Sequence, residues 1–152
     1  MKALKLFLTL IIVSLLLLSC QQANNNHRLA ILPMQAIEQS ALQAPKPVAG
    51  IFELKVKSTD FQQRLEFLNS EIDHQDQRNL IIAIRPNAVK ELTDLHGQTP
   101  RDFFLNKRIR VKGEAKRQKI WILYKNKNTR KYYYQTKIFV KSASQISLIS
   151  SI

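Results

Sequence analysis

Hydrophobic and polar positions alternate over several short segments in the C-terminal two thirds of the chain. In residues 51–57 the side chains of Phe52, Leu54 and Val56 fall on one face and charged side chains on the other, which predicts a half-buried strand. Residues 65–68 predict a second strand, and the polar residues 58–63 between the two are expected to form a loop. Residues 80–84 are apolar at every position, as is typical of a strand buried on both faces.

Helical spacing follows the third strand. Pro86 ends that strand, and Asn87 is expected to cap a helix that ends at Gly97. The apolar face of this helix is expected to consist of Ala88, Leu92 and Leu95. Thr99-Pro100 then predicts a second short helical turn, which carries Phe103 and Phe104.

The segment 104–146 is a basic ribbon with β patterning at both ends. Residues 107–113 predict a fourth strand with Ile109 and Val111 facing inward, and Gly113 is expected to allow a bulge. The last predicted strand runs from Tyr132 to about Val140. The long insertion between these strands predicts an extended hairpin.

The predicted order is therefore strand, strand, strand, helix, strand, strand. This is the succession of the OB fold, a five-stranded Greek-key barrel with a helix between strands 3 and 4. We therefore expect a mainly β protein with this barrel and an extended strand 4–strand 5 hairpin.

The domain also resembles a known group of sequences over roughly residues 48–148. The resemblance is to the small OB-fold domains of exported, largely uncharacterised bacterial proteins. It is carried by Phe67-Leu-Asn-Ser70 with Asp73, Asp76 and Asn79, by Pro100 and Phe104 ahead of Lys107-Arg-Ile-Arg-Val-Lys-Gly113, and by the segment 138–146. This chain departs from the pattern in its much longer insertion before Gln135 and in His74-Gln75, where members often have Tyr-Arg.

The N-terminus carries an export signal. Lys2 and Lys5 precede an apolar run from Leu6 to Leu18, which is too short to span a bilayer and predicts a signal peptide over residues 1–19. Leu17-Leu18-Ser19-Cys20 resembles the lipobox of bacterial lipoproteins, in which the cysteine is lipidated and becomes the mature N-terminus. Cys20, the lone cysteine, is therefore the expected lipid anchor, and a plain signal peptide cut near Ser19 is the alternative.

Residues 20–48 are expected to form a polar tether between this anchor and a barrel domain over residues 49–152. Within the tether, residues 30–42 predict a short helix that uses Ile31, Met34, Ile37 and Leu42. Residue 21 is Gln and not the Asp that in enteric bacteria favours the inner membrane, so the expected location is the cell envelope, anchored to the outer membrane and facing the periplasm.

Positive charge is concentrated in the C-terminal third. The chain has 24 Lys and Arg residues against 11 Asp and Glu, and residues 101–152 hold 14 of the basic residues and two of the acidic ones. Such a field attracts anionic partners. The alternative is a solvated face that keeps a small protein soluble.

The hairpin insertion combines these cations with aromatic rings. Rings stack on bases or sugars, and cations contact phosphates, so the hairpin is the predicted ligand site. The candidate residues are Lys116, Arg117, Lys119, Trp121, Tyr124, Lys125, Lys127, Arg130, Lys131 and Tyr133. Alternatively, these rings only stabilise a long β-hairpin through cross-strand pairing. This alternative applies above all to Tyr132 and Tyr134, which share the core face.

The sequence gives little sign of catalysis, a cofactor or a metal. His27, His74 and His96 are scattered, and polar residues such as Asp73 and Asp76 are expected to hold a turn through bonds to the backbone. We therefore expect a non-enzymatic, membrane-anchored binding protein for an anionic polymer, lipid headgroup or acidic protein, with nucleic acid as the ligand suggested by fold analogy. The alternative is a structural lipoprotein whose hairpin edge binds a partner.

Overall fold

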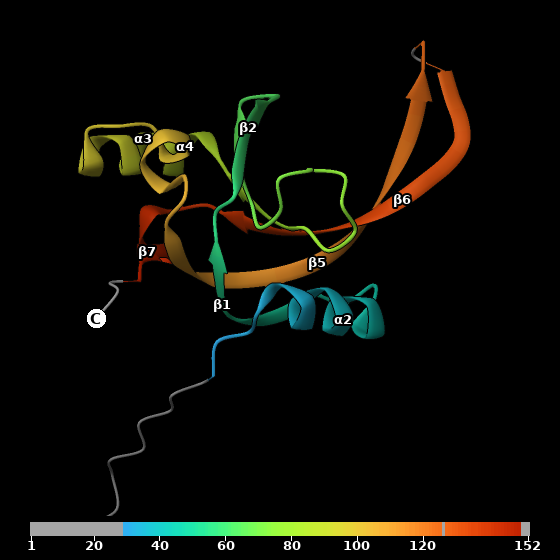
Figure 1. Cartoon of the computed structure of the whole chain (residues 1–152), viewed down its shortest axis with the longest axis horizontal. Coiled ribbons are helices and arrows are strands. Elements are labelled where there is room, and N and C mark those ends of the chain that lie inside the picture. Colours follow the sequence, from blue (N-terminus) through green and yellow to red (C-terminus); the bar gives the residue numbers. More distant parts are fainter. Residues whose placement is uncertain (1–28, 126, 150–152) are drawn as a thin grey trace, which may run out of the picture.

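The computed structural model describes residues 29–125 and 127–149 (Figure 1). The expected signal peptide, the expected anchor Cys20 and the first part of the expected tether lie outside these residues. The elements, in chain order, are α2 (Pro33–Gln43), β1 (Val48–Lys55), β2 (Ser58–Gln62), β3 (Leu65–Asn69), β4 (Leu80–Ile84), α3 (Pro86–His96), α4 (Pro100–Phe104), β5 (Arg108–Tyr124), β6 (Lys127–Val140), a 3-10 turn (Ala143–Gln145) and β7 (Ile146–Leu148).

The protein is mainly β, as predicted, and its strands form one curled sheet that resembles an open half-barrel (Figure 1). The strand order is β1-β5-β6-β4-β3-β2, and β7 also pairs with β5. All pairs are antiparallel except β4 and β6, which are parallel.

The core lies on one face of this sheet. Alternate residues of β1 and β5 supply it, among them Phe52, Leu54, Ile109 and Val111, as the patterning predicts. All five residues of β4 are buried, which confirms the continuous apolar run as a strand covered on both faces.

The prediction of a loop over residues 58–63 is wrong, because Ser58–Gln62 forms β2 and pairs with β3. β2 pairs on one side only and its residues are exposed or half-buried, so it needs no alternation of apolar side chains. Gln63 and Arg64 close the turn with positive φ angles of 52° and 66°. Neither is the Gly or Asn that usually marks such a turn, and the sequence therefore gave no hairpin signal.

The first of the two helices after β4 starts two residues earlier than predicted, and the second starts as predicted. Arg85, and not Asn87, is the N-cap of α3. Pro86 is the first helical residue, because the fixed φ of proline suits that position. Gly97 ends α3 in the left-handed conformation, as predicted, whereas Leu95 is 68% exposed and does not join the core. The Thr99 hydroxyl accepts from the backbone N–H of Asp102 at the start of α4, which confirms the predicted cap.

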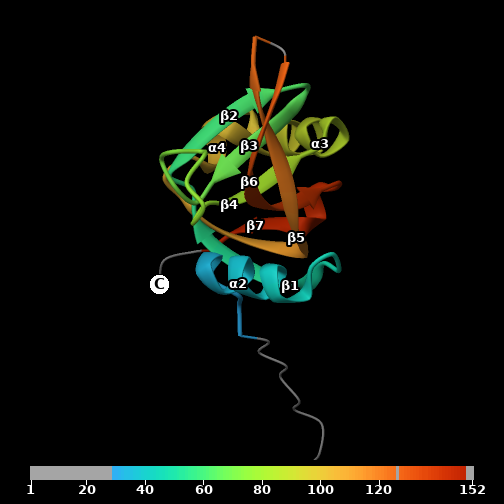
Figure 2. The ribbon, with the colours of Figure 1, turned by 90° about the vertical axis from the view of Figure 1, so that its right-hand side faces the viewer.

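The expected N-terminal helix exists but packs with a different face. Ala36 and Ser40 of α2 are fully buried, whereas Met34 and Leu42 are 56% and 80% exposed. The Ser40 hydroxyl donates to the carbonyl of Ala115 in β5 at 3.3 Å. Small side chains one turn apart let the helix approach the strands closely, and so α2 lies against the sheet at the end opposite the hairpin tip (Figure 2).

Gly113 makes no bulge. The pairing of β1 with β5 runs through it without interruption, with Gly50 directly opposite. A Cβ at residue 113 would lie 2.8 Å from Cγ2 of Ile138, so glycine is required there by a close approach of β6 to β5.

Candidate ligand-binding arm

The β5–β6 hairpin extends beyond the sheet as a two-stranded arm, defined here as residues 116–125 and 127–135 (Figure 1). The pairing of β5 with β1 ends at Ala115, and that of β6 with β4 begins at Thr136. Among the strands that the structure describes, the two strands of the arm therefore pair only with each other, as the long insertion predicts. A register shift between Trp121 and Leu123 interrupts the ladder near the tip.

One face of the arm continues the core face of the sheet and carries a row of rings and cations. Because Ala115 and Ile138 pair in the core, alternation places Arg117, Lys119 and Trp121 of β5 on the same face. Opposite them on β6 are Thr136, Tyr134 and Tyr132. This face is called the core-side face of the arm.

Cations and rings contact each other along the core-side face. The Arg117 guanidinium lies 3.7 Å from the ring centre of Tyr134, and the Lys119 ammonium lies 4.4 Å from that of Tyr132. The rings of Trp121 and Tyr132 meet edge-on at 5.4 Å. Trp121 and Tyr132 are nonetheless 47% and 46% exposed, so these rings remain accessible while the cations are held beside them.

The opposite face of the arm is anchored to the body. Gln135 is buried and donates to the carbonyl oxygen of His74 at 3.1 Å, which ties β6 to the turn between β3 and β4. Burial raises the pKa of the neighbouring Tyr133 hydroxyl, and the negative charge of Asp73 adds to this effect. Tyr133 is half-buried at the base of the arm.

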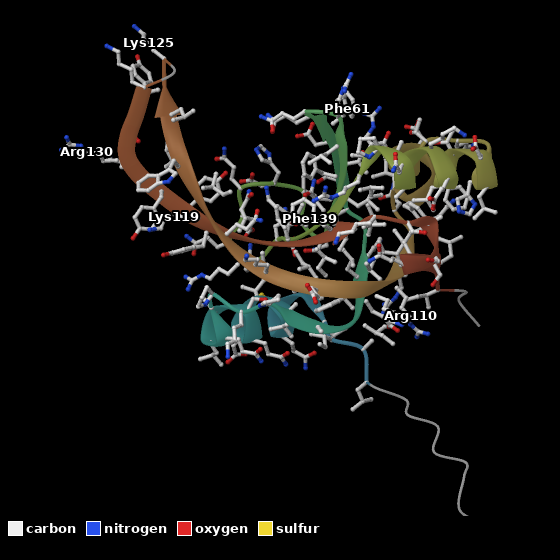
Figure 3. The ribbon with its side chains drawn as sticks, turned by 180° about the vertical axis from the view of Figure 1, so that it is seen from behind. Phe61, Arg110, Lys119, Lys125, Arg130 and Phe139 are labelled. Carbon is white, nitrogen blue, oxygen red and sulfur yellow. The ribbon has the colours of Figure 1, made fainter. Side chains whose placement is uncertain are left out.

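Further cations lie on the outer part of the arm (Figure 3). Lys125 lies at the far end, with its ammonium 5.5 Å from the ring centre of Tyr124, and Arg130 lies farther down the arm. Lys127 and Lys131 are exposed on β6. Lys125 and Arg130 both have positive φ angles, of 46° and 62°, which mark the irregular backbone of the tip.

The structure thus divides the ten predicted residues into three groups. Arg117, Lys119 and Trp121 share the core-side face with Tyr132 and Tyr134, which the sequence left open as core residues. Lys116 and Tyr133 lie on the opposite face. The remaining five lie on the outer part of the arm: Tyr124, Lys125, Lys127, Arg130 and Lys131.

The turn at the base of the arm is held by polar side chains, as predicted. The backbone N–H of Gln75 donates to Asp73 and that of Arg78 to Asp76, both at 2.8 Å. In the part of the chain that the structure describes, no group of three or more His, Cys, Asp or Glu side chains could hold a metal ion. Among the same residues no helix is long and apolar enough to cross a bilayer.

Asp76 provides a test of this turn. Hydrogen bonds from the side chain and backbone of Arg78 lower the pKa of Asp76 to about 2. The folded-state pKa lies below the ordinary value, so the resulting stabilisation is present above that ordinary value and is lost as the pH falls through about 2. We expect NMR titration to show this low pKa and Arg78→Ala to return it toward the ordinary value; an unchanged pKa in the variant would contradict the assignment.

Comparison of the chain with protein-family models, with curated proteins and with solved structures finds no match.

Proposed function

We propose that the half-barrel is an OB-type barrel in which β1 and β2 are two halves of one bent strand. They stand at opposite ends of the strand order but are separated only by Val56 and Lys57. The N–H of Val56 donates to the carbonyl of Lys107, on the β5 side, and the N–H of Lys57 donates to that of Asn69 in β3. Counted as one strand, the pair supports the succession of five strands, with a helix after the third, that is typical of this fold.

We propose further that the protein is a lipid-anchored periplasmic binding lipoprotein that captures an anionic ligand with the arm. The observation that carries this proposal is the row of exposed rings and adjacent cations on the core-side face. Rings offer flat surfaces on which bases or sugars stack, while Arg117 and Lys119 supply charge for phosphate, sulfate or carboxylate groups. The ligand is therefore a nucleic acid, an anionic polysaccharide or a lipid headgroup. The proposed role is binding and assigns no catalytic residue.

Proximity to the membrane suits this role. An acylated Cys20 would hold the domain at the bilayer surface, and the arm would extend the reach of its cations. Electrostatic attraction between such an arm and a polyanion accelerates capture and weakens as salt is added.

The test is binding of heparin and single-stranded DNA by the full chain in detergent across a salt series. Trp121 is the single tryptophan and lies within the proposed site, so its fluorescence is a direct reporter. We expect the variant Lys119→Glu/Lys125→Glu to bind at least about tenfold more weakly at low salt, with the slope against log salt smaller by about 1.4, because two phosphate contacts are lost.

The matched control is Lys55→Glu/Arg108→Glu, which changes the net charge equally at an exposed cross-strand pair of β1 and β5 away from the arm. At about 0.1 M salt the control is expected to keep its affinity within about twofold, since the Debye length is then about 10 Å and exposed charges farther from the ligand are screened. Equal losses in both variants would show a non-specific charge effect, and no loss in the arm variant would remove the proposed site.

The second candidate function is partner binding by strand addition. It is favoured by the outer edges of the arm, where neither β5 nor β6 has a further strand beside it among residues 29–125 and 127–149. A salt-resistant protein partner that is captured from envelope extracts by the full chain, and not by a chain with a shortened arm, would support this function in place of the first.

A further inference from the structure

A second basic site lies on the body of the protein, away from the tip of the arm. A groove of about 1100 Å³ lies over β1, β5 and β6 and over the short segments that adjoin these strands. The lining includes Arg85, Lys112, Lys116, Phe139, Lys141 and Gln145. Figure 3 shows Phe139 in the body, far from Lys125.

The groove is strongly positive. Four cations line it, Arg85, Lys112, Lys116 and Lys141, against the single carboxylate of Glu114. Over residues 29–125 and 127–149, none of these four cations forms an ion pair. Four positive side chains around one groove repel one another, so a bound anion would relieve this repulsion.

Strand pairing brings these cations together from distant parts of the chain. The parallel pairing of β4 with β6 places Ile84 beside Val140, and the N–H of Arg85 donates to the Val140 carbonyl at 2.9 Å. Arg85 and Lys141, the residues that directly follow these two strand ends, therefore lie side by side. On β5, Lys112 and Lys116 alternate with core residues and so point away from the core.

The wall beside Lys141 is fixed by one glutamine. The Gln145 side chain accepts from the backbone N–H groups of Lys141 and Ser142, at 2.7 and 3.2 Å. Its amide also donates to the carbonyl of Lys112 at 3.0 Å. These three bonds tie the turn after β6 to β5, so the backbone around the cations is held in place before a ligand arrives.

Phe139 gives the groove an apolar surface. It is half-buried, and the Arg85 guanidinium lies 5.3 Å from its ring centre. A flat ring next to a planar guanidinium is suited to a ligand that has both a ring and an anionic group, because arginine binds phosphate oxygens through paired N–H groups.

We propose that the groove bounded by Arg85, Lys112, Lys141 and Phe139 binds a small phosphate ester whose ring lies against Phe139. This site is distinct from the arm, with which it shares only Lys116, and it goes beyond the proposed capture of a polymer. The cations converge on a single groove, which favours a compact phosphate ester over an extended chain.

The test is calorimetric titration of the full chain in detergent with adenosine 5′-monophosphate and, separately, with pyrophosphate. We expect saturable binding of both, and Lys112→Ala/Lys141→Ala is expected to weaken each by at least about tenfold. The control Lys55→Ala/Arg108→Ala removes the same charge from residues that do not line the groove and is expected to leave the affinity within about twofold. Phe139→Leu is expected to weaken the nucleotide more than pyrophosphate, because only the nucleotide has a ring.

Two further measurements distinguish binding in the groove from binding by the arm, and a soluble phosphate ester from a lipid headgroup. The arm variant Lys119→Glu/Lys125→Glu is expected to keep phosphate-ester binding, so that failure of the arm hypothesis and failure of the groove hypothesis remain distinguishable. Vesicles containing phosphatidylglycerol, compared with neutral vesicles, show whether a lipid headgroup is the source of the phosphate. Absence of saturable binding to both soluble probes, or binding that depends on the arm and not on Lys112 and Lys141, would overturn the proposal.

Discussion

Replacing Asn79 with alanine is expected to lower the free energy of unfolding by about 3 kcal/mol. Asn79 is 1% exposed, and its amide nitrogen donates to Asn69 Oδ1 at 3.1 Å and to the carbonyl of His74 at 3.3 Å. Its oxygen accepts from the Ser70 hydroxyl and from the backbone N–H of Glu71. Alanine removes all four bonds and leaves buried polar partners without a replacement.

Urea unfolding followed by circular dichroism measures this loss. Asn87→Ala is the matched control, since Asn87 is exposed in the first turn of α3, and the expected change is below about 0.5 kcal/mol. The turn that Asn79 holds also accepts a hydrogen bond from the Gln135 side chain, through the carbonyl of His74. The NMR signals of Tyr133 at the base of the arm should therefore shift in Asn79→Ala. A loss below about 1 kcal/mol would mean that water replaces the four bonds.

The body of the protein was largely predictable because its strands have local signals. Residues 80–84 are apolar at every position, and Phe52 and Leu54 alternate with polar neighbours, so burial could be inferred without tertiary information. β2 lacked such a signal, because its polar side chains lie at the end of the sheet and its turn uses Gln63 and Arg64. There the pairing with β3 decides the conformation, and local propensity does not.

The position of the arm was predictable, but the division of its side chains was only partly so. Counted from Ala115 in the core, alternation along β5 places Arg117, Lys119 and Trp121 on one face. The register shift between Trp121 and Leu123 then interrupts the alternation of side chains between the two faces. The residues beyond it therefore cannot be assigned to a face from the sequence. Tyr132 and Tyr134 do share the core-side face, but they lie beyond the core because the body ends near Thr136.

The groove could not be found from the sequence. Arg85 and Lys141 are 56 residues apart and meet only because β4 and β6 are parallel neighbours. The single local signal was the alternation of Lys112, Glu114 and Lys116 with Val111, Gly113 and Ala115, which marks an outward charged row on β5. Such a row is common on solvated strands, and so its meaning depends on what the fold places beside it.

The second large effect is expected from Phe104→Ala, which should cost about 4 kcal/mol of unfolding free energy. Phe104 is fully buried at the end of α4, with its ring edge-on to Phe103 at 5.0 Å between centres. A helix of five residues has little stability of its own, so α4 depends on this buried ring and on Glu66, which accepts from the N–H of Arg101 at 3.0 Å. Alanine leaves a cavity that the fixed strands beneath cannot fill.

Phe103→Ala is the matched control because it removes the same ring one residue earlier, from a position that is only partly buried. The Phe103 ring stacks on His96 at 3.8 Å and receives the Lys107 ammonium over its face at 3.8 Å, contacts that together are worth about 1 to 2 kcal/mol. Chemical denaturation of both variants measures the difference. If Phe103→Ala destabilises the protein as much as Phe104→Ala, the aromatic stack on the surface, and not burial of the Phe104 ring, holds α4 in place.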